Sequence, residues 1–259
     1  MLSVEDSGQG PVVVLLHGLT ATRRYVVMGS KSLERSGHRV IAYDARGHGG
    51  SDPAPQPDAY TYADLATDLL GVLDERGVER ATLAGASMGA HTIVRFALDH
   101  PDRVAGMVLI TPAYTPDRDP GLARWDGLSE GLRSGGVEGF VEAYGEPPVP
   151  AQWRETVLTI LRQRLSRHEH PDAVADALRA VPRSRPFEDM AELAALASAP
   201  TVVVADRDEA DPEHPLAVGE AYAEAIPGAR LLVEEPGESP LAWSGSRLSK
   251  IIAEVVKEA

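Results

Sequence analysis

The chain has 259 residues, which is enough for one sizeable domain with room for an inserted subdomain. Its formal net charge of −14, from 25 basic and 39 acidic residues, argues against nucleic acid or an anionic membrane as a partner. The absence of cysteine excludes disulfides and metal sites built on thiolates.

The N-terminal region and the composition together predict a cytoplasmic protein. No apolar signal-like segment precedes the first acidic residues, and no apolar run reaches the length of a membrane span. Only three of the 25 basic residues are lysines, and alanine, proline and glycine are abundant. This bias is typical of a GC-rich bacterial genome, so we expect a bacterial protein.

Six short apolar runs predict the strands of a sheet. Each is apolar at consecutive positions, as expected of strands covered on both faces. Helical patterns fill the gaps, and one of them, with Leu65, Leu69 and Leu73 on one face, is bounded by Thr61 and Gly77. This alternation predicts an α/β fold with a mostly parallel sheet. The six runs are residues 11–18, 38–44, 81–87, 104–110, 200–206 and 229–235.

Two polar loops follow the first two predicted strands. The first reads HGLT at residues 17–20, and the second reads DARGHGGS at residues 44–51. His17 is expected mainly to hold its loop in place, although it is also a candidate substrate contact. His48 is expected to be a structural residue of the second loop.

The sequence GASMG at residues 85–89 follows a predicted strand and opens a helical pattern. This is the G-x-S-x-G motif in the strand–turn–helix context that it requires. Gly85 and Gly89 allow a sharp turn that exposes the Ser87 hydroxyl, and the helix N-terminus favours negative charge developing beside it. The N–H groups of Leu19 and Met88 would then be two donors for an oxyanion.

These motifs resemble those of the α/β-hydrolase superfamily, close to its esterase and enol-lactone hydrolase branch. The resemblance covers almost the whole chain. It implies a mostly parallel sheet with helices on both faces, an inserted helical lid and a serine nucleophile at Ser87. The matching residues are His17 and Gly18, then Asp44, Arg46, Gly47, His48, Gly49 and Ser51, and then Gly85, Ser87 and Gly89.

One long stretch interrupts the alternation of strands and helices. Residues 113–199 contain no evident strand, but Trp153, Val157, Ile160, Leu161 and Leu165 recur at helical spacing. A connection of this length is too long for a simple loop. We therefore predict a helical lid at 113–199, inserted into a core formed by 1–112 and 200–259.

The candidate triad acid lies after the strand at 200–206. The sequence ADRDEADP at residues 205–212 follows the family pattern G-x-x-D-x-x-x-P except at its glycine. By resemblance, Asp208 is the acid, with Asp206 as the alternative.

The candidate base departs from the family pattern. Where relatives carry G-H-x-P after the last strand, this chain has Gly237, Glu238, Ser239 and Pro240. Glu238 beside Asp208 would place two carboxylates together and raise the apparent pKa of the pair.

Four replacements for the missing histidine stay open. The first is His214, six residues after Asp208, with Pro215 expected at the first helical position and His214 at the N-cap. The second is Glu238 itself. The third is His91, one turn into the helix after Ser87, which suits a substrate contact better than a base. The last is a lid histidine, His168 or His170, or no base at all.

The sequence therefore predicts hydrolysis of a small carboxylic ester or lactone by Ser87, with Asp208 orienting the base. No metal and no organic cofactor is implied, the partner is a small-molecule substrate, and nothing in the sequence predicts an oligomeric state. Two alternatives remain: a ligand-binding protein that has lost its proton relay, and a lyase or cyclase that uses the oxyanion donors.

Overall fold

The computed structural model describes residues 1–209, 211–238 and 242–259. All six predicted strands are present, with ends that lie within two residues of the ends of the apolar runs. They are β2 (Val12–Leu16), β3 (Arg39–Tyr43), β4 (Ala81–Ala86), β5 (Val104–Ile110), β6 (Thr201–Ala205) and β7 (Arg230–Val233).

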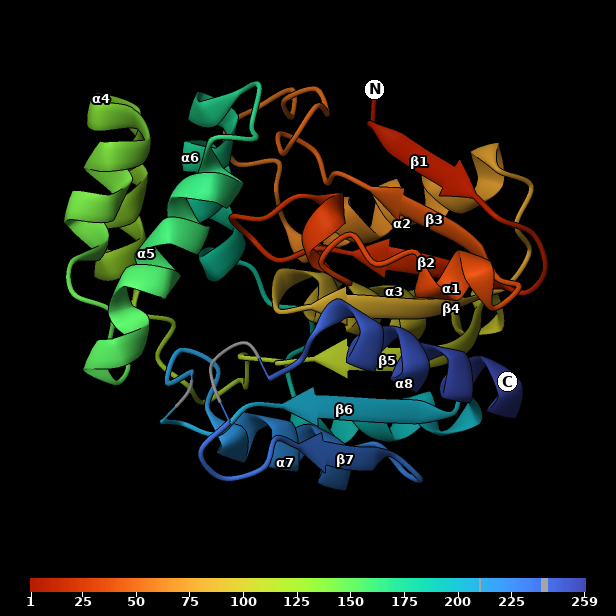
Figure 1. The fold of residues 1–259 in the computed structure, drawn as a ribbon. Coiled ribbons are helices and arrows are strands. Elements are labelled where there is room, and N and C mark those ends of the chain that lie inside the picture. The colour runs from red at the N-terminus through yellow and green to blue at the C-terminus, as the bar shows by residue number, and fades with distance from the viewer. Residues whose placement is uncertain (210, 239–241) are drawn as a thin grey trace.

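A further strand, β1 (Val4–Ser7), was not predicted. Its sequence, VEDS, has a single strongly apolar residue, because the strand lies at the edge of the sheet and buries little. Within the described residues the strand order is β1-β3-β2-β4-β5-β6-β7 (Figure 1). β1 pairs antiparallel with β3, and every other neighbouring pair is parallel. The parallel strands therefore end at one edge.

Helices cover both faces of the sheet. On one face, α8 (Gly245–Glu258) and the single turn α1 (Ser32–Arg35) pack on a cluster that includes Val13, Val108 and Val202. The other helices that flank the sheet are α2 (Tyr62–Glu75), α3 (Met88–Asp99) and α7 (Leu216–Ala225), which pack on the opposite face. Short 3₁₀ turns complete the core at Arg23–Tyr25 and Pro101–Arg103.

The segment between β5 and β6 is helical throughout its regular structure, as predicted. It contains α4 (Leu122–Tyr144), α5 (Ala151–Leu165) and α6 (Pro171–Ala180), followed by 3₁₀ turns at Val181–Arg183 and Met190–Ser198. Figure 1 shows α4, α5 and α6 beyond the C-terminal ends of the parallel strands. They share a small core of their own, built around Leu132, Phe140, Leu161, Leu165 and Leu178.

Helix α4 folds back on itself at Gly136, where φ is 61° and the backbone leaves helical geometry. A Cβ on Gly131 would lie 2.5 Å from the carbonyl oxygen of Gly139, so the two halves approach with backbone in contact. Only glycine allows this approach.

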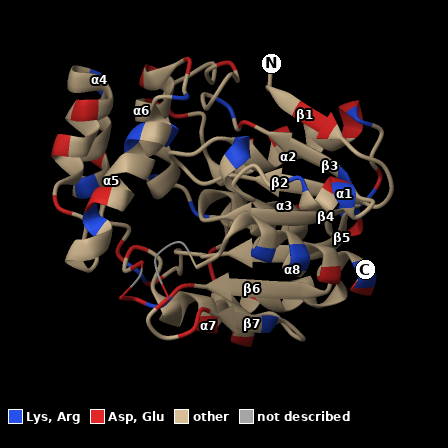
Figure 2. Cartoon of the chain, in the orientation of Figure 1, with Lys and Arg blue, Asp and Glu red and all other residues tan. Residues whose placement is uncertain are grey.

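Charged residues are absent from most central strands and lie on helices and loops. Figure 2 shows acidic and basic residues interspersed over these surfaces, with β2, β4, β5 and β6 free of both. Within the described ranges, no helix is both long and apolar enough to cross a lipid bilayer.

Candidate active site

Ser87 occupies a strained turn between β4 and α3. Its φ of 51° lies in a region that L-residues rarely adopt, and such strain is common at functional sites. A Cβ on Gly85 would lie 2.5 Å from the Gly89 carbonyl carbon, and one on Gly89 would lie 2.2 Å from the Leu16 carbonyl oxygen. Both glycines are therefore required for the turn that presents Ser87.

His214 lies directly against Ser87. Its Nε2 is 2.9 Å from the Ser87 Oγ, and its Nδ1 is 2.7 Å from Asp211 Oδ2. A carboxylate can only accept, so Nδ1 carries the proton that is donated to Asp211, and Nε2 is free to accept the Ser87 hydroxyl proton. The three side chains form a continuous Ser87–His214–Asp211 relay.

Backbone hydrogen bonds of described residues between β6 and α7 hold Asp211 and His214 in place. The His214 N–H donates to the Asp211 carbonyl at 3.2 Å, and the Asp211 N–H donates to the Arg207 carbonyl at 3.0 Å. Arg207 is in turn fixed to β7's end, because its N–H donates to Glu234 Oε1 at 2.8 Å. Asp211 and His214 are only three residues apart in the sequence, and these hydrogen bonds hold their side chains in contact.

The pKa values of His214 and Asp211 are those expected of an imidazole that is hydrogen-bonded to a carboxylate. Burial alone lowers the pKa of His214, but the charge and hydrogen bond of Asp211 outweigh it and raise that pKa above the ordinary 6.5. Burial raises the pKa of Asp211, but the charge and hydrogen bond of His214 outweigh it and hold that pKa below the ordinary 3.8. Asp211 is therefore ionised at neutral pH.

Asp208, expected to orient the base, lies elsewhere in this loop. Its Oδ1 accepts the backbone N–H of Leu216 at 2.8 Å, which caps the start of α7. Leu216 is the first helical residue and Pro215 the N-cap, so the expected placement of Pro215 within the helix and His214 at its cap is off by one residue. The family pattern drew attention to Asp208, while the D-x-x-H spacing of Asp211 and His214 was the signal for the observed pair.

Asp206, the alternative acid, is buried beside the relay without contacting His214 through a hydrogen bond in the described structure. Burial, together with the charges of Asp211 and Glu234, raises the pKa of Asp206 to about 7. Its Oδ1 has no hydrogen-bond partner among the described residues. The carboxyl of Asp206 is therefore only partly ionised at neutral pH, unlike that of Asp211.

Glu238 is engaged with the last helix. Its carboxylate accepts the Glu235 N–H at 2.9 Å and pairs with Arg247 of α8 at 3.1 Å. These two contacts hold the pKa of Glu238 below its ordinary value, opposite to the rise expected from a pairing with Asp208. The adjoining Ser239 and Pro240 of the predicted motif lie outside the described residues.

His91 is buried next to Ser87 in a fixed protonation state. Its Nε2 accepts the N–H groups of Ala113 at 3.0 Å and Tyr114 at 3.2 Å, and its Nδ1 is 2.9 Å from the Tyr62 hydroxyl. Burial lowers the pKa of His91 to about 3. The ring is thus neutral, and both nitrogens are occupied by contacts other than Ser87.

Other histidines hold the loops around the site. The Nε2 of His17 accepts the Ala45 N–H at 2.9 Å, which is the loop-holding task expected of it. The Nδ1 of His168 accepts the Gly49 N–H at 2.8 Å, and the imidazole of His48 lies within 2.5 Å of the Leu19 carbonyl oxygen. His170 is the N-cap residue of α6. His17, His48 and His168 therefore connect the two polar loops to the helical segment.

Ser87 opens onto a cavity of about 100 Å³. Leu19 and Met88, the expected oxyanion donors, line it together with His91. Met88 is the first residue of α3, so its N–H has no acceptor within the helix. No described residue accepts the Leu19 N–H. The remaining lining residues are Tyr62, Ala113, Tyr114, Arg118, Asp119, Pro120, Trp125, Val181, Pro182 and Ser184.

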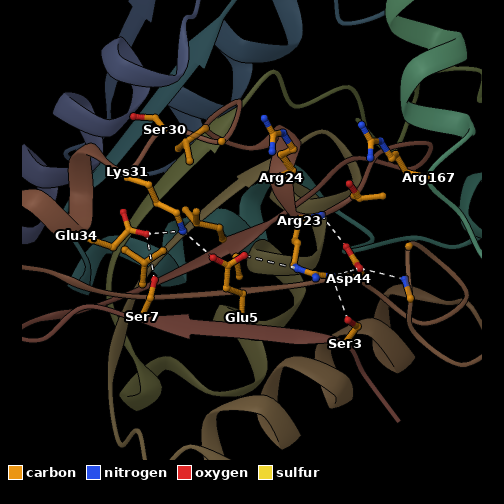
Figure 3. A pocket seen from close by; sticks show the side chains of 18 of the residues that line it. Ser3, Glu5, Ser7, Arg23, Arg24, Ser30, Lys31, Glu34, Asp44 and Arg167 are labelled. Carbon is orange, nitrogen blue, oxygen red and sulfur yellow. Dashed lines mark hydrogen bonds and ion pairs between the residues drawn. The ribbon is translucent and has the colours of Figure 1, made fainter.

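A larger cavity of about 430 Å³ lies away from Ser87, between β1, the loop after β2 and α1 (Figure 3). Its charged groups largely satisfy one another. Arg23 pairs with the buried Asp44, and Lys31 pairs with Glu5 and Glu34. This network ties the edge strand to the rest of the sheet.

Comparison with known proteins places the fold in a family. The chain matches the family described as alpha/beta hydrolase fold over residues 11–243. It is 32% identical over 243 residues to 2-hydroxy-6-oxononadienedioate/2-hydroxy-6-oxononatrienedioate hydrolase 2 of Pseudomonas putida, covering 90% of this chain and 82% of that one. It is also 32% identical to the putative carbamate hydrolase RutD of Variovorax paradoxus, over 80% of this chain and 77% of the relative.

Shorter matches and solved structures are also hydrolases. The chain covers 46% and 42% of two epoxide hydrolases of Siraitia grosvenorii, to which it is 36% and 34% identical. A thermophilic esterase from Thermogutta terrifontis superimposes with a TM-score of 0.80 at 28% identity, covering 99% of this chain and 93% of that one. An enol-lactonase from Burkholderia xenovorans shares the fold, with a TM-score of 0.79 at 24% identity over 99% and 96% of the two chains. The chain belongs to the α/β-hydrolase family.

Proposed function

We propose that this α/β-hydrolase cleaves a small carboxylic ester or lactone through a Ser87–His214–Asp211 triad. The observation that carries the proposal is the position of His214, with one ring nitrogen on the Ser87 hydroxyl and the other on Asp211. This is the arrangement that activates a serine hydroxyl, whatever the order of the residues in the chain.

The proposed reaction has two stages. Ser87 Oγ attacks the carbonyl carbon while its proton moves to His214 Nε2, and the N–H groups of Leu19 and Met88 stabilise the oxyanion. His214 then protonates the leaving alkoxide, which leaves an acyl-serine. Water attacks the acyl-serine, giving its proton to His214, and the serine is released with the carboxylic acid. For a lactone the leaving oxygen stays attached to the acyl group.

The non-hydrolytic alternatives rested on the lack of a base. A binding protein that had lost its proton relay would not need a histidine hydrogen-bonded between Ser87 and a carboxylate, so the His214 contacts favour an enzyme. The hydrolase and esterase relatives favour hydrolysis over lyase or cyclase chemistry.

We also propose that residues 113–199 act as a lid on a core of 1–112 and 200–259. Trp125, Val181 and Ser184 of this segment line the cavity at Ser87. Arg124 of α4 pairs with Glu213, the neighbour of His214, so the position of the segment is coupled to the loop that carries the base.

The experiment that tests the proposed function is the pH profile of p-nitrophenyl acetate hydrolysis. His214 must be neutral to accept the serine proton, and Asp211 raises its pKa. We therefore expect kcat/KM to be low in acid and to rise with pH through a midpoint above the ordinary histidine value of 6.5. Activity that persists below about pH 5 would indicate a carboxylate base and contradict the assignment.

A further inference from the structure

The cavity at Ser87 is enclosed by groups whose hydrogen-bonding directions can be assigned. His91 Nε2 accepts two backbone N–H groups, so it carries no proton. Because burial keeps the ring neutral, the one ring proton lies on Nδ1 and is donated to the Tyr62 oxygen. The Tyr62 hydroxyl therefore accepts from His91, and its own proton is directed elsewhere.

The Ser184 hydroxyl also accepts a hydrogen bond, so its own proton is directed elsewhere. Its Oγ accepts the backbone N–H of Tyr62 at 2.9 Å, one of the unpaired donors at the start of α2. Neither the Tyr62 nor the Ser184 hydroxyl proton has an acceptor among the described residues. Both residues line the cavity that contains Ser87. Two hydroxyl groups are thus oriented to donate and have no protein partner.

Three acceptors in the cavity wall are already engaged by nearby donors. The Ala113 carbonyl accepts from Arg118 at 2.8 Å, and Asp119 Oδ1 accepts from the Gly121 N–H at 2.9 Å. The Pro120 carbonyl accepts the Trp125 indole N–H at 3.0 Å. A bound molecule therefore meets two available donors, the hydroxyls of Tyr62 and Ser184, which favours a ligand that carries an acceptor oxygen.

The cavity corresponds to the acyl side of a bound ester. It is lined by Ser87 and by both proposed oxyanion donors, Leu19 and Met88, whereas His214 is not among the described residues that line it. The leaving oxygen must lie beside His214, because His214 protonates it. The acyl group is then the part that remains for the cavity.

We propose that the Tyr62 and Ser184 hydroxyls donate hydrogen bonds to an acceptor oxygen on the acyl group of the substrate. This selectivity rests on the proposed esterase function and narrows its substrates to acyl groups that carry an ether, keto or carboxylate oxygen beyond the scissile carbonyl. An acyl chain of plain hydrocarbon would leave the protons of the buried Tyr62 hydroxyl and the half-buried Ser184 hydroxyl without an acceptor.

The test compares esters that differ only in this oxygen. p-Nitrophenyl methoxyacetate and butyrate have acyl chains of equal length, as do p-nitrophenyl 4-oxopentanoate and pentanoate. For each pair, the ratio of kcat/KM with the oxygen to kcat/KM without it is measured in each protein, so that intrinsic ester reactivity cancels between proteins. Tyr62→Phe and Ser184→Ala should each lower this ratio about tenfold for at least one pair, with the two changes affecting the same pair.

Tyr222→Phe is the matched control. The Tyr222 hydroxyl is fully buried, has no partner among the described residues and does not line the cavity. Its removal should leave the ratios unchanged. Ratios that are unchanged in Tyr62→Phe and Ser184→Ala, or lowered equally in Tyr222→Phe, would overturn the proposal, since the hydroxyls would then serve the interior and not the substrate.

Failure of this proposal is separable from failure of the proposed function. If the wild-type protein cleaves none of the four esters, hydrolysis of such esters is refuted, and selectivity is measured as binding of the intact esters to Ser87→Ala protein. Tyr62→Phe in that background should still reduce the preference for the oxygen-bearing ester. An unchanged preference would contradict the role of Tyr62 independently of catalysis.

Discussion

Replacing His214 with alanine should lower kcat for an activated ester on the order of 10⁴- to 10⁶-fold, because loss of a triad base is among the costliest changes to a serine hydrolase. The physical reason is the 2.9 Å contact between His214 Nε2 and Ser87 Oγ, because no other histidine ring in the described part of the chain hydrogen-bonds the Ser87 hydroxyl. Without it, the serine proton has no acceptor, and the residual rate depends on the oxyanion donors and on binding. The measurement is burst and steady-state kinetics with p-nitrophenyl acetate.

Glu238→Gln is the control for this change. Glu238 occupies the sequence position where relatives carry their histidine, but its carboxylate pairs with Arg247 on α8. We expect its kcat to stay within a few-fold of the wild-type value, since the ion pair is partly exposed and such pairs contribute little. Abolished turnover in Glu238→Gln alongside a normal His214→Ala variant would reverse the assignment.

The second large effect is expected from Asp211→Asn, which should lower kcat about 10³- to 10⁴-fold. An asparagine can present its amide N–H to His214 Nδ1, which favours the tautomer protonated on Nε2, and that tautomer cannot accept the serine proton. The pH profile should shift as well. Loss of the Asp211 charge removes the influence that raises the pKa of His214, so the midpoint of the remaining activity should fall.

Asp208→Asn is the matched control for Asp211→Asn, with the same chemical change three residues earlier. Asp208 accepts the Leu216 N–H at the start of α7, and the side-chain oxygen of asparagine can accept the same hydrogen bond. Folding and kcat should therefore both be retained. If Asp208→Asn had the larger effect on kcat, Asp208 would be the acid, as the family pattern suggests, and the Asp211 contact would be incidental. Circular dichroism and thermal unfolding establish that both variants are folded.

Much of the fold was predictable from the sequence because buried strands are built from consecutive apolar residues. The strands β2, β4, β5 and β6 are covered by helices on both faces, so each is a run without charged residues and mostly apolar. β1 was not predicted, because an edge strand with the sequence VEDS has no apolar run. The helical character of the segment between β5 and β6 followed from its spacing, whereas the fold-back of α4 at Gly136 depends on a close glycine contact that no periodicity reveals.

Site residues were predictable where neighbouring residues in the sequence fix their position. Ser87 was marked by two glycines that the turn requires, and His214 was the first of the replacements considered for the base. The acid was assigned to Asp208 because a family pattern, and not local geometry, pointed to it. Asp211 reaches His214 through a short hydrogen-bonded turn that includes the contact from the Asp211 N–H to the Arg207 carbonyl. A pattern borrowed from relatives cannot anticipate such a turn when the base has moved to another loop.

The most direct test of the triad is the site and rate of labelling by a fluorophosphonate probe, measured by peptide mass spectrometry. The probe requires an activated serine, so we expect a single adduct on the peptide that contains Ser87, absent in Ser87→Ala and slowed by several orders of magnitude in His214→Ala. Labelling at Ser87 that proceeds at the wild-type rate in His214→Ala, or labelling confined to another serine, would contradict the account.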